Sequence, residues 1–107
     1  MVYLFGGGFT SGSAAVTDYG PQYWMDNDIT MVLINYRLGP FGFLTTGSEE
    51  IPGNMGLFDQ RLGLEWVREN IQYFGGDPDQ VTLFGESAGS TSVSLHLIHP
   101  ASQGTQS

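Results

Sequence analysis

Residues 81–89 read VTLFGESAG. A short apolar run leads into a G-x-S-x-G pentapeptide, and small residues suited to the start of a helix follow it, which indicates a strand-to-helix turn around Ser87. The turn needs glycine two residues before and two residues after the serine, because a side chain at either position would collide with the neighbouring strand and helix. The pentapeptide alone would be weak evidence in a chain with 16 glycines, but its context predicts a nucleophile elbow whose hydroxyl stands above the carboxyl end of a sheet.

A second glycine-rich turn follows the apolar run at residues 1–5 and reads GGGF, residues 6–9. In acyl transfer, backbone N–H groups must approach a developing negative oxygen, and glycine permits that approach because it has no Cβ. This stretch therefore predicts an oxyanion loop. A flexible turn remains the alternative.

Three short apolar runs, residues 1–5, 30–36 and 80–84, alternate with helical stretches. This alternation predicts an α/β fold with a parallel sheet. We expect a short helix near residues 21–26 and a long ordered loop over residues 37–53.

The helix expected over residues 54–74 has apolar side chains on two separate arcs. One arc contains Met55, Phe58, Leu62 and Trp66, and the other contains Leu57, Leu64, Val67 and Ile71. A helix at the surface of a small domain needs only one apolar stripe, so two arcs predict burial on two sides. We therefore expect the isolated chain to aggregate.

Several further motifs occur in one order along the chain. They are GGGF at 6–9, NYRLGPFGF at 35–43, PGN at 52–54, DQ at 59–60, FGGDP at 74–78 and GESAG at 85–89. With these motifs the chain resembles the type-B carboxylesterases, the cholinesterase-like branch of the α/β-hydrolases. The resemblance implies an α/β-hydrolase fragment with three parallel central strands, the oxyanion loop, the nucleophile elbow and flanking helices, in which the first strand lies between the other two. It makes residues 1–107 an internal part of a single domain, with no second domain.

The resemblance also implies roles for single residues. Ser87 would be the nucleophile that forms the acyl-enzyme, and the backbone N–H groups of Gly7, Gly8 and Ala88 would form the oxyanion hole. Glu86 and Phe9 would line the pocket. Many members of the family carry a histidine where this chain has Phe5, which leaves the substrate range open.

The residues after Ser87 include no Asp or Glu, whereas the mechanism needs an acid and then a histidine downstream of the serine. His96 and His99 lie on the same expected helix, roughly 13 to 18 Å from Ser87, and are expected to be helix-end or surface residues. We therefore expect the triad acid and histidine downstream of residue 107. We expect the parent protein to be a serine carboxylesterase and this chain on its own to be inactive. The alternative is that the parent is a catalytically inactive, cholinesterase-like adhesion or binding protein.

The composition of the chain limits the classes of molecule that it is expected to bind. A formal net charge of −8, with only three basic residues, argues against nucleic acid or an anionic membrane surface. No cluster has metal-ligand spacing, so neither a metal nor a cofactor is expected, and no apolar stretch approaches the length of a membrane span. The expected partner is a small-molecule ester. Oligomeric state and location stay open, although members of the family are often secreted.

Three charged residues have predicted structural roles. Arg37 follows an apolar run and is expected to form a buried or partly buried ion pair with Asp59 or Glu86. Asp59 and Asp77 are expected to be turn and helix-start residues.

Overall fold

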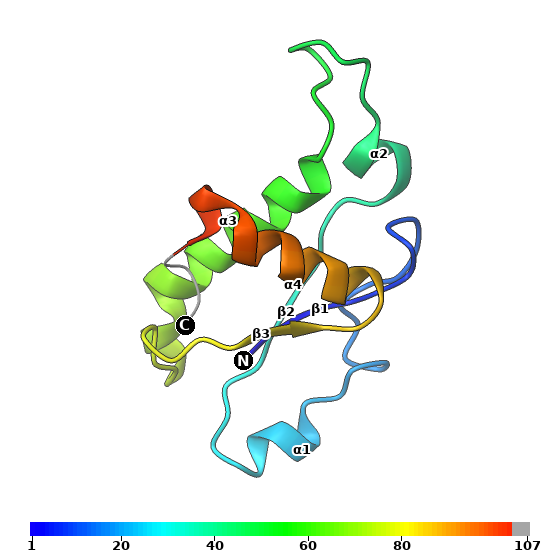
Figure 1. The fold of residues 1–107 in the computed structure, drawn as a ribbon. Coiled ribbons are helices and arrows are strands. Elements are labelled where there is room, and N and C mark those ends of the chain that lie inside the picture. Colours follow the sequence, from blue (N-terminus) through cyan, green and yellow to red (C-terminus); the bar gives the residue numbers. More distant parts are fainter. Residues whose placement is uncertain (104–107) are drawn as a thin grey trace.

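A computed structural model describes residues 1–103 of the chain. Its centre is a three-stranded parallel sheet in which β1 (Val2–Leu4) lies between β2 (Val32–Ile34) and β3 (Leu83–Gly85) (Figure 1). Tyr3 pairs with Leu33 on one side and with Phe84 on the other. The parallel direction and the central place of the first strand, both expected from the sequence, are confirmed.

Two long helices cover one face of this sheet. They are α3 (Met55–Asn70), which a 3₁₀ turn, η1 (Ile71–Phe74), extends, and α4 (Ala88–Ile98), which a second 3₁₀ turn, η2 (Pro100–Ser102), follows. The short helix α1 (Gln22–Met25) lies on the opposite side of the sheet (Figure 1). The predicted helices near residues 21–26 and 54–74 are thereby confirmed, with the second ending as a 3₁₀ turn.

The region 37–53, expected to be a loop, contains a further short helix, α2 (Gly39–Phe43). Pro40 stands in its first turn, where the fixed φ of proline suits a helix and no N–H is lost from the hydrogen-bond ladder. Gly42 is buried, and a Cβ there would collide with the carbonyl group of Arg37. The prediction counted glycine and proline as helix breakers, whereas here they suit the start of a short helix and a close approach between chain segments.

Side chains of the central strand alternate between two apolar clusters, as the pleat of a strand requires. The cluster under the helices contains Val2, Leu4, Ile34, Leu64, Val67, Ile71 and Val81. On the other face Tyr3, Phe5 and Tyr36 are buried against residues of the loops and neighbouring strands. The strand that leads to the glycine loop is thus covered on both sides.

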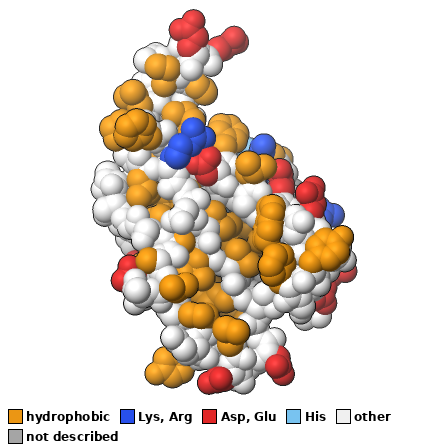
Figure 2. All heavy atoms as spheres, turned by 180° about the vertical axis from the view of Figure 1, so that it is seen from behind, with side chains coloured by type: hydrophobic (Ala, Val, Ile, Leu, Met, Phe, Trp, Pro, Cys, Tyr) orange, Lys and Arg blue, Asp and Glu red, His pale blue; other side chains and the backbone are white. Residues whose placement is uncertain are grey.

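The two arcs of α3 have different surroundings. Leu64, Val67 and Ile71 are buried against the sheet, whereas Phe58, Leu62 and Trp66 are 49%, 65% and 46% exposed. On α4, Leu97 and Ile98 are also exposed. Figure 2 shows apolar side chains spread over the face opposite to the view of Figure 1, with acidic side chains mostly around its edge. The chain therefore presents much apolar surface outside its own core.

Candidate active site

Ser87 occupies the turn between β3 and α4, and its side chain is exposed. Its backbone has φ 55° and ψ −121°, a combination that non-glycine residues rarely adopt. Such a conformation persists only where the surrounding structure holds it in place. The serine therefore stands at the carboxyl end of the sheet in a strained turn.

Two glycines make this turn possible. A Cβ on Gly85 would lie 2.6 Å from the carbonyl carbon of Gly89 and 2.7 Å from the carbonyl oxygen of Leu4. A Cβ on Gly89 would collide with the same Leu4 oxygen. The partners in these collisions are main-chain atoms of the central strand and of Gly89 itself, which cannot rotate away as a side chain can. The steric reason for both glycines, expected from the sequence, is confirmed.

The glycine loop after β1 lies beside the serine. A Cβ on Gly6 would be 3.0 Å from the Cβ of Ser87 and 2.7 Å from Oε2 of Glu86. Gly7, Gly8 and Phe9 all have positive φ, at 117°, 62° and 62°. Segments about 80 residues apart in the sequence thus meet at one end of the sheet.

Three backbone N–H groups of these two segments stand out. Within residues 1–103 we find no acceptor for the N–H groups of Gly7, Gly8 and Ala88. Ala88 is the first residue of α4, where an N–H has no partner inside the helix. The carbonyl of Gly7, in contrast, accepts hydrogen bonds of 3.1 Å from the N–H groups of both Thr10 and Ser11, which fold the loop back on itself.

Glu86 adjoins the glycine loop, and Phe9 is the last residue of that loop. The Glu86 side chain is exposed and adjoins Gly6. The Phe9 ring is half-buried and packs against Phe43, with 5.1 Å between ring centroids. Their role as pocket residues stays a prediction.

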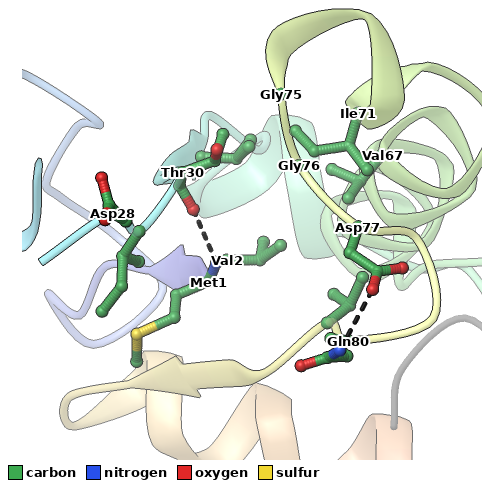
Figure 3. A pocket seen from close by; sticks show the side chains of 13 residues that line it. Met1, Val2, Asp28, Thr30, Val67, Ile71, Gly75, Gly76, Asp77 and Gln80 are labelled. Carbon is green, nitrogen blue, oxygen red and sulfur yellow. Dashed lines mark hydrogen bonds between the residues drawn. The ribbon is translucent and has the colours of Figure 1, made fainter.

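Three hollows in the described part of the chain lie away from the serine. One of about 260 Å³ opens at the amino ends of the strands, between Val2, Asp28, Ile71 and Gln80 (Figure 3). A second, of about 340 Å³, lies between α3 and α4, and a third, of about 400 Å³, lies beside Tyr3 and Trp24. Ser87 lines none of these three hollows, and it is exposed.

His96 was expected at a helix end or on the surface. It does lie in the last turn of α4, but it is not a surface residue, because only 4% of it is exposed. Its Nδ1 is 2.9 Å from Oγ of Ser102 and its Nε2 is 2.9 Å from Oε1 of Gln60. Burial, and then the charges of His99 and Arg61, lower the pKa of His96. Helical spacing could not reveal this environment, because its partners come from other elements; His99 is exposed at the helix end, as expected.

Arg37 pairs with Asp59, one of its two expected partners. Nε of Arg37 is 2.8 Å from Oδ2 of Asp59 and Nη2 is 2.9 Å from Oδ1, a two-pronged contact. The Arg37 side chain is 54% exposed, so the expected burial holds only for Asp59, at 26%. Burial alone would raise the pKa of Asp59, but the hydrogen bonds and charge of Arg37 outweigh it and lower that pKa.

Of the two aspartates expected in turns or at helix starts, one is found there and one is not. Asp59 lies within α3 and not in a turn. Asp77 is a turn residue, as expected, because its Oδ1 accepts a 2.9 Å hydrogen bond from the N–H of Asp79. Among residues 1–103 there is no group of three or more metal-ligating side chains. No helix in that range is long and apolar enough to cross a membrane.

Comparison with known proteins identifies the family. A family model described as the carboxylesterase family matches residues 1–107. The chain belongs to the carboxylesterase family. Among relatives of this carboxylesterase chain, juvenile hormone esterase of Tribolium castaneum is 55% identical over 104 residues, covering 97% of this chain and 18% of the relative.

Two cholinesterases are similarly close to this carboxylesterase chain. Cholinesterase 1 of Branchiostoma lanceolatum is 53% identical over 104 residues, covering 96% of this chain and 29% of the relative. Acetylcholinesterase of Danio rerio is 52% identical over 105 residues, covering 96% and 17%. The chain thus spans less than a third of the length of each of these relatives. The resemblance to type-B, cholinesterase-like carboxylesterases is confirmed.

Proposed function

We propose that this chain is an internal part of a single carboxylesterase domain, and that the whole protein hydrolyses small-molecule carboxylic esters through a covalent intermediate on Ser87. The names of the relatives, two cholinesterases and a juvenile hormone esterase, support ester hydrolysis. One observation carries the assignment of the serine: Ser87 has a strained φ of 55° in a strand-to-helix turn that adjoins the glycine loop. In α/β-hydrolases this turn presents the nucleophile.

In the proposed reaction, Oγ of Ser87 attacks the carbonyl carbon of the ester and gives up its proton to a histidine base. The C–O bond to the alcohol then breaks, the alcohol takes that proton and the acyl group remains on Ser87. Water attacks the acyl-enzyme in the same way, releasing the carboxylic acid and restoring the hydroxyl. Each half-reaction forms and breaks one C–O bond, with no oxidation or reduction.

The negative oxygen formed in each attack would be held by the N–H groups of Gly7, Gly8 and Ala88. The absence of acceptors for these donors within residues 1–103 supports this role. One such donor contributes roughly 10²- to 10³-fold to kcat in enzymes of this kind. Glu86 and Phe9 would line the approach to the serine, with the Glu86 carboxylate beside Gly6.

The base and its acid partner would come from the chain beyond residue 107. After Ser87 the sequence contains no Asp or Glu. His96 is a poor candidate for the base because Gln60 and Ser102 occupy its two ring nitrogens. The 107-residue chain on its own is therefore expected to be inactive.

A chimera tests this proposal. Residues of this chain replace the matching segment of the Tribolium juvenile hormone esterase, which supplies the rest of the domain, and hydrolysis of p-nitrophenyl acetate is measured. We expect an active chimera in which Ser87→Ala lowers kcat by at least about 10⁴-fold. The matched control is Ser94→Ala, which removes an exposed hydroxyl from the same helix and should leave kcat unchanged.

The acyl-enzyme is sought directly with a fluorophosphonate, which should add its mass to the peptide that contains Ser87. A folded chimera that lacks activity and labelling would overturn the proposal and favour a binding protein without catalysis. Full activity in the Ser87→Ala variant would also overturn it.

A further inference from the structure

Four buried polar side chains connect three elements behind the serine turn. Gln60 on α3, Ser92 and His96 on α4 and Ser102 on η2 are 0%, 0%, 4% and 1% exposed. Burying polar groups costs free energy unless each finds a hydrogen-bond partner. These four side chains bond to one another, and the order of their bonds can be worked out atom by atom.

The direction of each bond follows from the chemistry of its groups. Oγ of Ser92 donates to the carbonyl of Ala88 at 3.0 Å and accepts from Nε2 of Gln60 at 3.1 Å. Oε1 of Gln60 can only accept a hydrogen bond. In its 2.9 Å contact with Nε2 of His96, the proton therefore lies on the histidine nitrogen. Nδ1 of the neutral ring is then an acceptor, and Ser102 donates to it at 2.9 Å. All four bonds point from Ser102 towards Ala88.

The chain of bonds continues through the backbone on both sides of Ser87. The Ala88 carbonyl belongs to the same peptide group as the N–H of Gly89, which donates to the carbonyl of Glu86 at 2.9 Å. That carbonyl belongs to the peptide group that carries the N–H of Ser87. Hydrogen bonds aligned in one direction strengthen one another. The buried side chains therefore help to fix the peptide group between Glu86 and Ser87 and the one between Ala88 and Gly89, which lie before and after the strained serine.

We infer that Gln60, Ser92 and His96 are positioning residues, which hold the peptide group before Ser87 and the one after Ala88 in the geometry that acyl transfer requires. This inference rests on the proposed function. None of the three touches the substrate; they act through Ala88 and Glu86. A strained turn needs such support, since its conformation persists only when its surroundings determine it.

The test compares two serines with the same local bond. Ser92 and Ser94 each donate to the carbonyl four residues before them on α4, at 3.0 and 3.2 Å, but only Ser92 is buried and bonded to Gln60. In the chimera described above, we expect Ser92→Ala to lower kcat about tenfold with KM within about twofold, because small misplacements of reacting groups cost rate. Ser94→Ala should change neither. Equal kinetics for both variants would overturn the inference.

A double-mutant cycle tests whether the residues act as one unit. Gln60→Met removes both bonds of the amide while keeping its approximate shape. If the chain of bonds acts as a unit, Gln60→Met combined with Ser92→Ala should lower kcat no further than the larger single effect. Fully additive losses would contradict a connected chain.

Loss of stability must be separated from loss of positioning. Active sites are counted by fluorophosphonate titration, so kcat refers to folded protein only. Val67→Ala serves as a control because Val67 is 1% exposed in the core under α3 and has no place in the chain of bonds. It should destabilise the protein while leaving kcat per active site unchanged; an equal fall in kcat would overturn the inference. If Ser92→Ala is not recovered folded, Gln60→Glu, which removes one donor, takes its place.

The two proposals can fail separately. If Ser87→Ala abolishes activity and Ser92→Ala behaves like Ser94→Ala, only the positioning role is wrong. If Ser87→Ala remains active, the proposed function is wrong. Hydrogen exchange at the Gly89 N–H of the chimera then tests the bonds without any reaction: it should become faster with Ser92→Ala than with Ser94→Ala, and equal rates would reject the inference.

Discussion

Tyr36 donates a 2.6 Å hydrogen bond to the carbonyl of Phe5, and the two rings stack with 4.5 Å between their centroids. Both side chains are buried, and burial raises the pKa of Tyr36. Phe5 is the last residue before the glycine loop. This pair therefore fixes the base of the loop from the segment that follows β2.

Removing the hydroxyl of Tyr36 should be costly. We expect Tyr36→Phe to lower the free energy of unfolding by about 1–2 kcal/mol, because a buried carbonyl loses its partner while the stacking remains. Urea unfolding of the chimera measures the change. Tyr23→Phe is the matched control, since Tyr23 is 85% exposed on α1; if both variants are equally stable, the hydrogen bond makes no net contribution.

Gly89→Ala should distort the serine turn. Its new Cβ meets the carbonyl oxygen of Leu4 in the central strand. We expect a loss of about 3 kcal/mol, at the upper end of overpacking costs, because main-chain atoms must shift. Thermal melting of the chimera, with Ser90→Ala at the next, exposed position as control, measures the loss. A melting temperature equal to that of the control would show that the turn accommodates a methyl group.

Mild acid should destabilise the protein through His96. Burial, followed by the charges of His99 and Arg61, lowers its pKa in the folded state, while an unfolded histidine titrates near about 6.5. The ring is hydrogen-bonded to Gln60 and Ser102, and the charged groups that act on it are His99 and Arg61. The stability contributed by neutral, buried His96 is therefore fully present above about pH 6.5. It is lost as the pH falls below that value, because the unfolded chain then binds a proton that the folded chain does not.

The expected slope reaches about 1.4 kcal/mol per pH unit once the unfolded histidine is charged and the folded one is not. Urea unfolding of the chimera at a series of pH values between 5 and 8 measures it. His96→Gln should flatten this part of the profile, whereas His99→Gln should keep most of it. An unchanged slope in His96→Gln would assign the acid sensitivity to another group.

The exposed apolar arc of α3 should make the isolated chain associate with itself. Leu62 is 65% exposed on this arc, and Ile98 on α4 is 75% exposed. Extensive exposed apolar surface favours association in water. Sedimentation velocity over a concentration series should show oligomers or aggregates of the 107-residue chain. Leu62→Glu should reduce them, while Val16→Glu, at an equally exposed loop position, should not; a monomer at all concentrations would contradict this prediction.

Much of the architecture was predictable because it depends on local sequence. Apolar runs predict the three strands. Gly85 and Gly89 predict a tight turn around Ser87, since only glycine tolerates so close an approach to neighbouring main-chain atoms. The order of the strands came from the family resemblance, which carries information about distant contacts that periodicity lacks.

The features that escaped prediction depend on tertiary contacts. His96 looks like a surface residue by helical position, but Gln60, 36 residues earlier, buries and pairs it. Arg37 was expected in a buried or partly buried ion pair with Asp59 or Glu86; it does pair with Asp59, but its own side chain is 54% exposed. In both cases a side chain's environment is set by a partner on another element, which spacing along one helix or strand does not reveal.

The collision that excludes a side chain at Gly85 and Gly89 involves the main chain of Leu4, and every amino acid has that main chain. No change of residue at position 4 can make room. Mutations elsewhere that alter only side chains cannot rescue a variant at either glycine unless they also move the strand. A library that tests the proposed pocket roles of Phe9 and Glu86 should therefore keep both glycines constant.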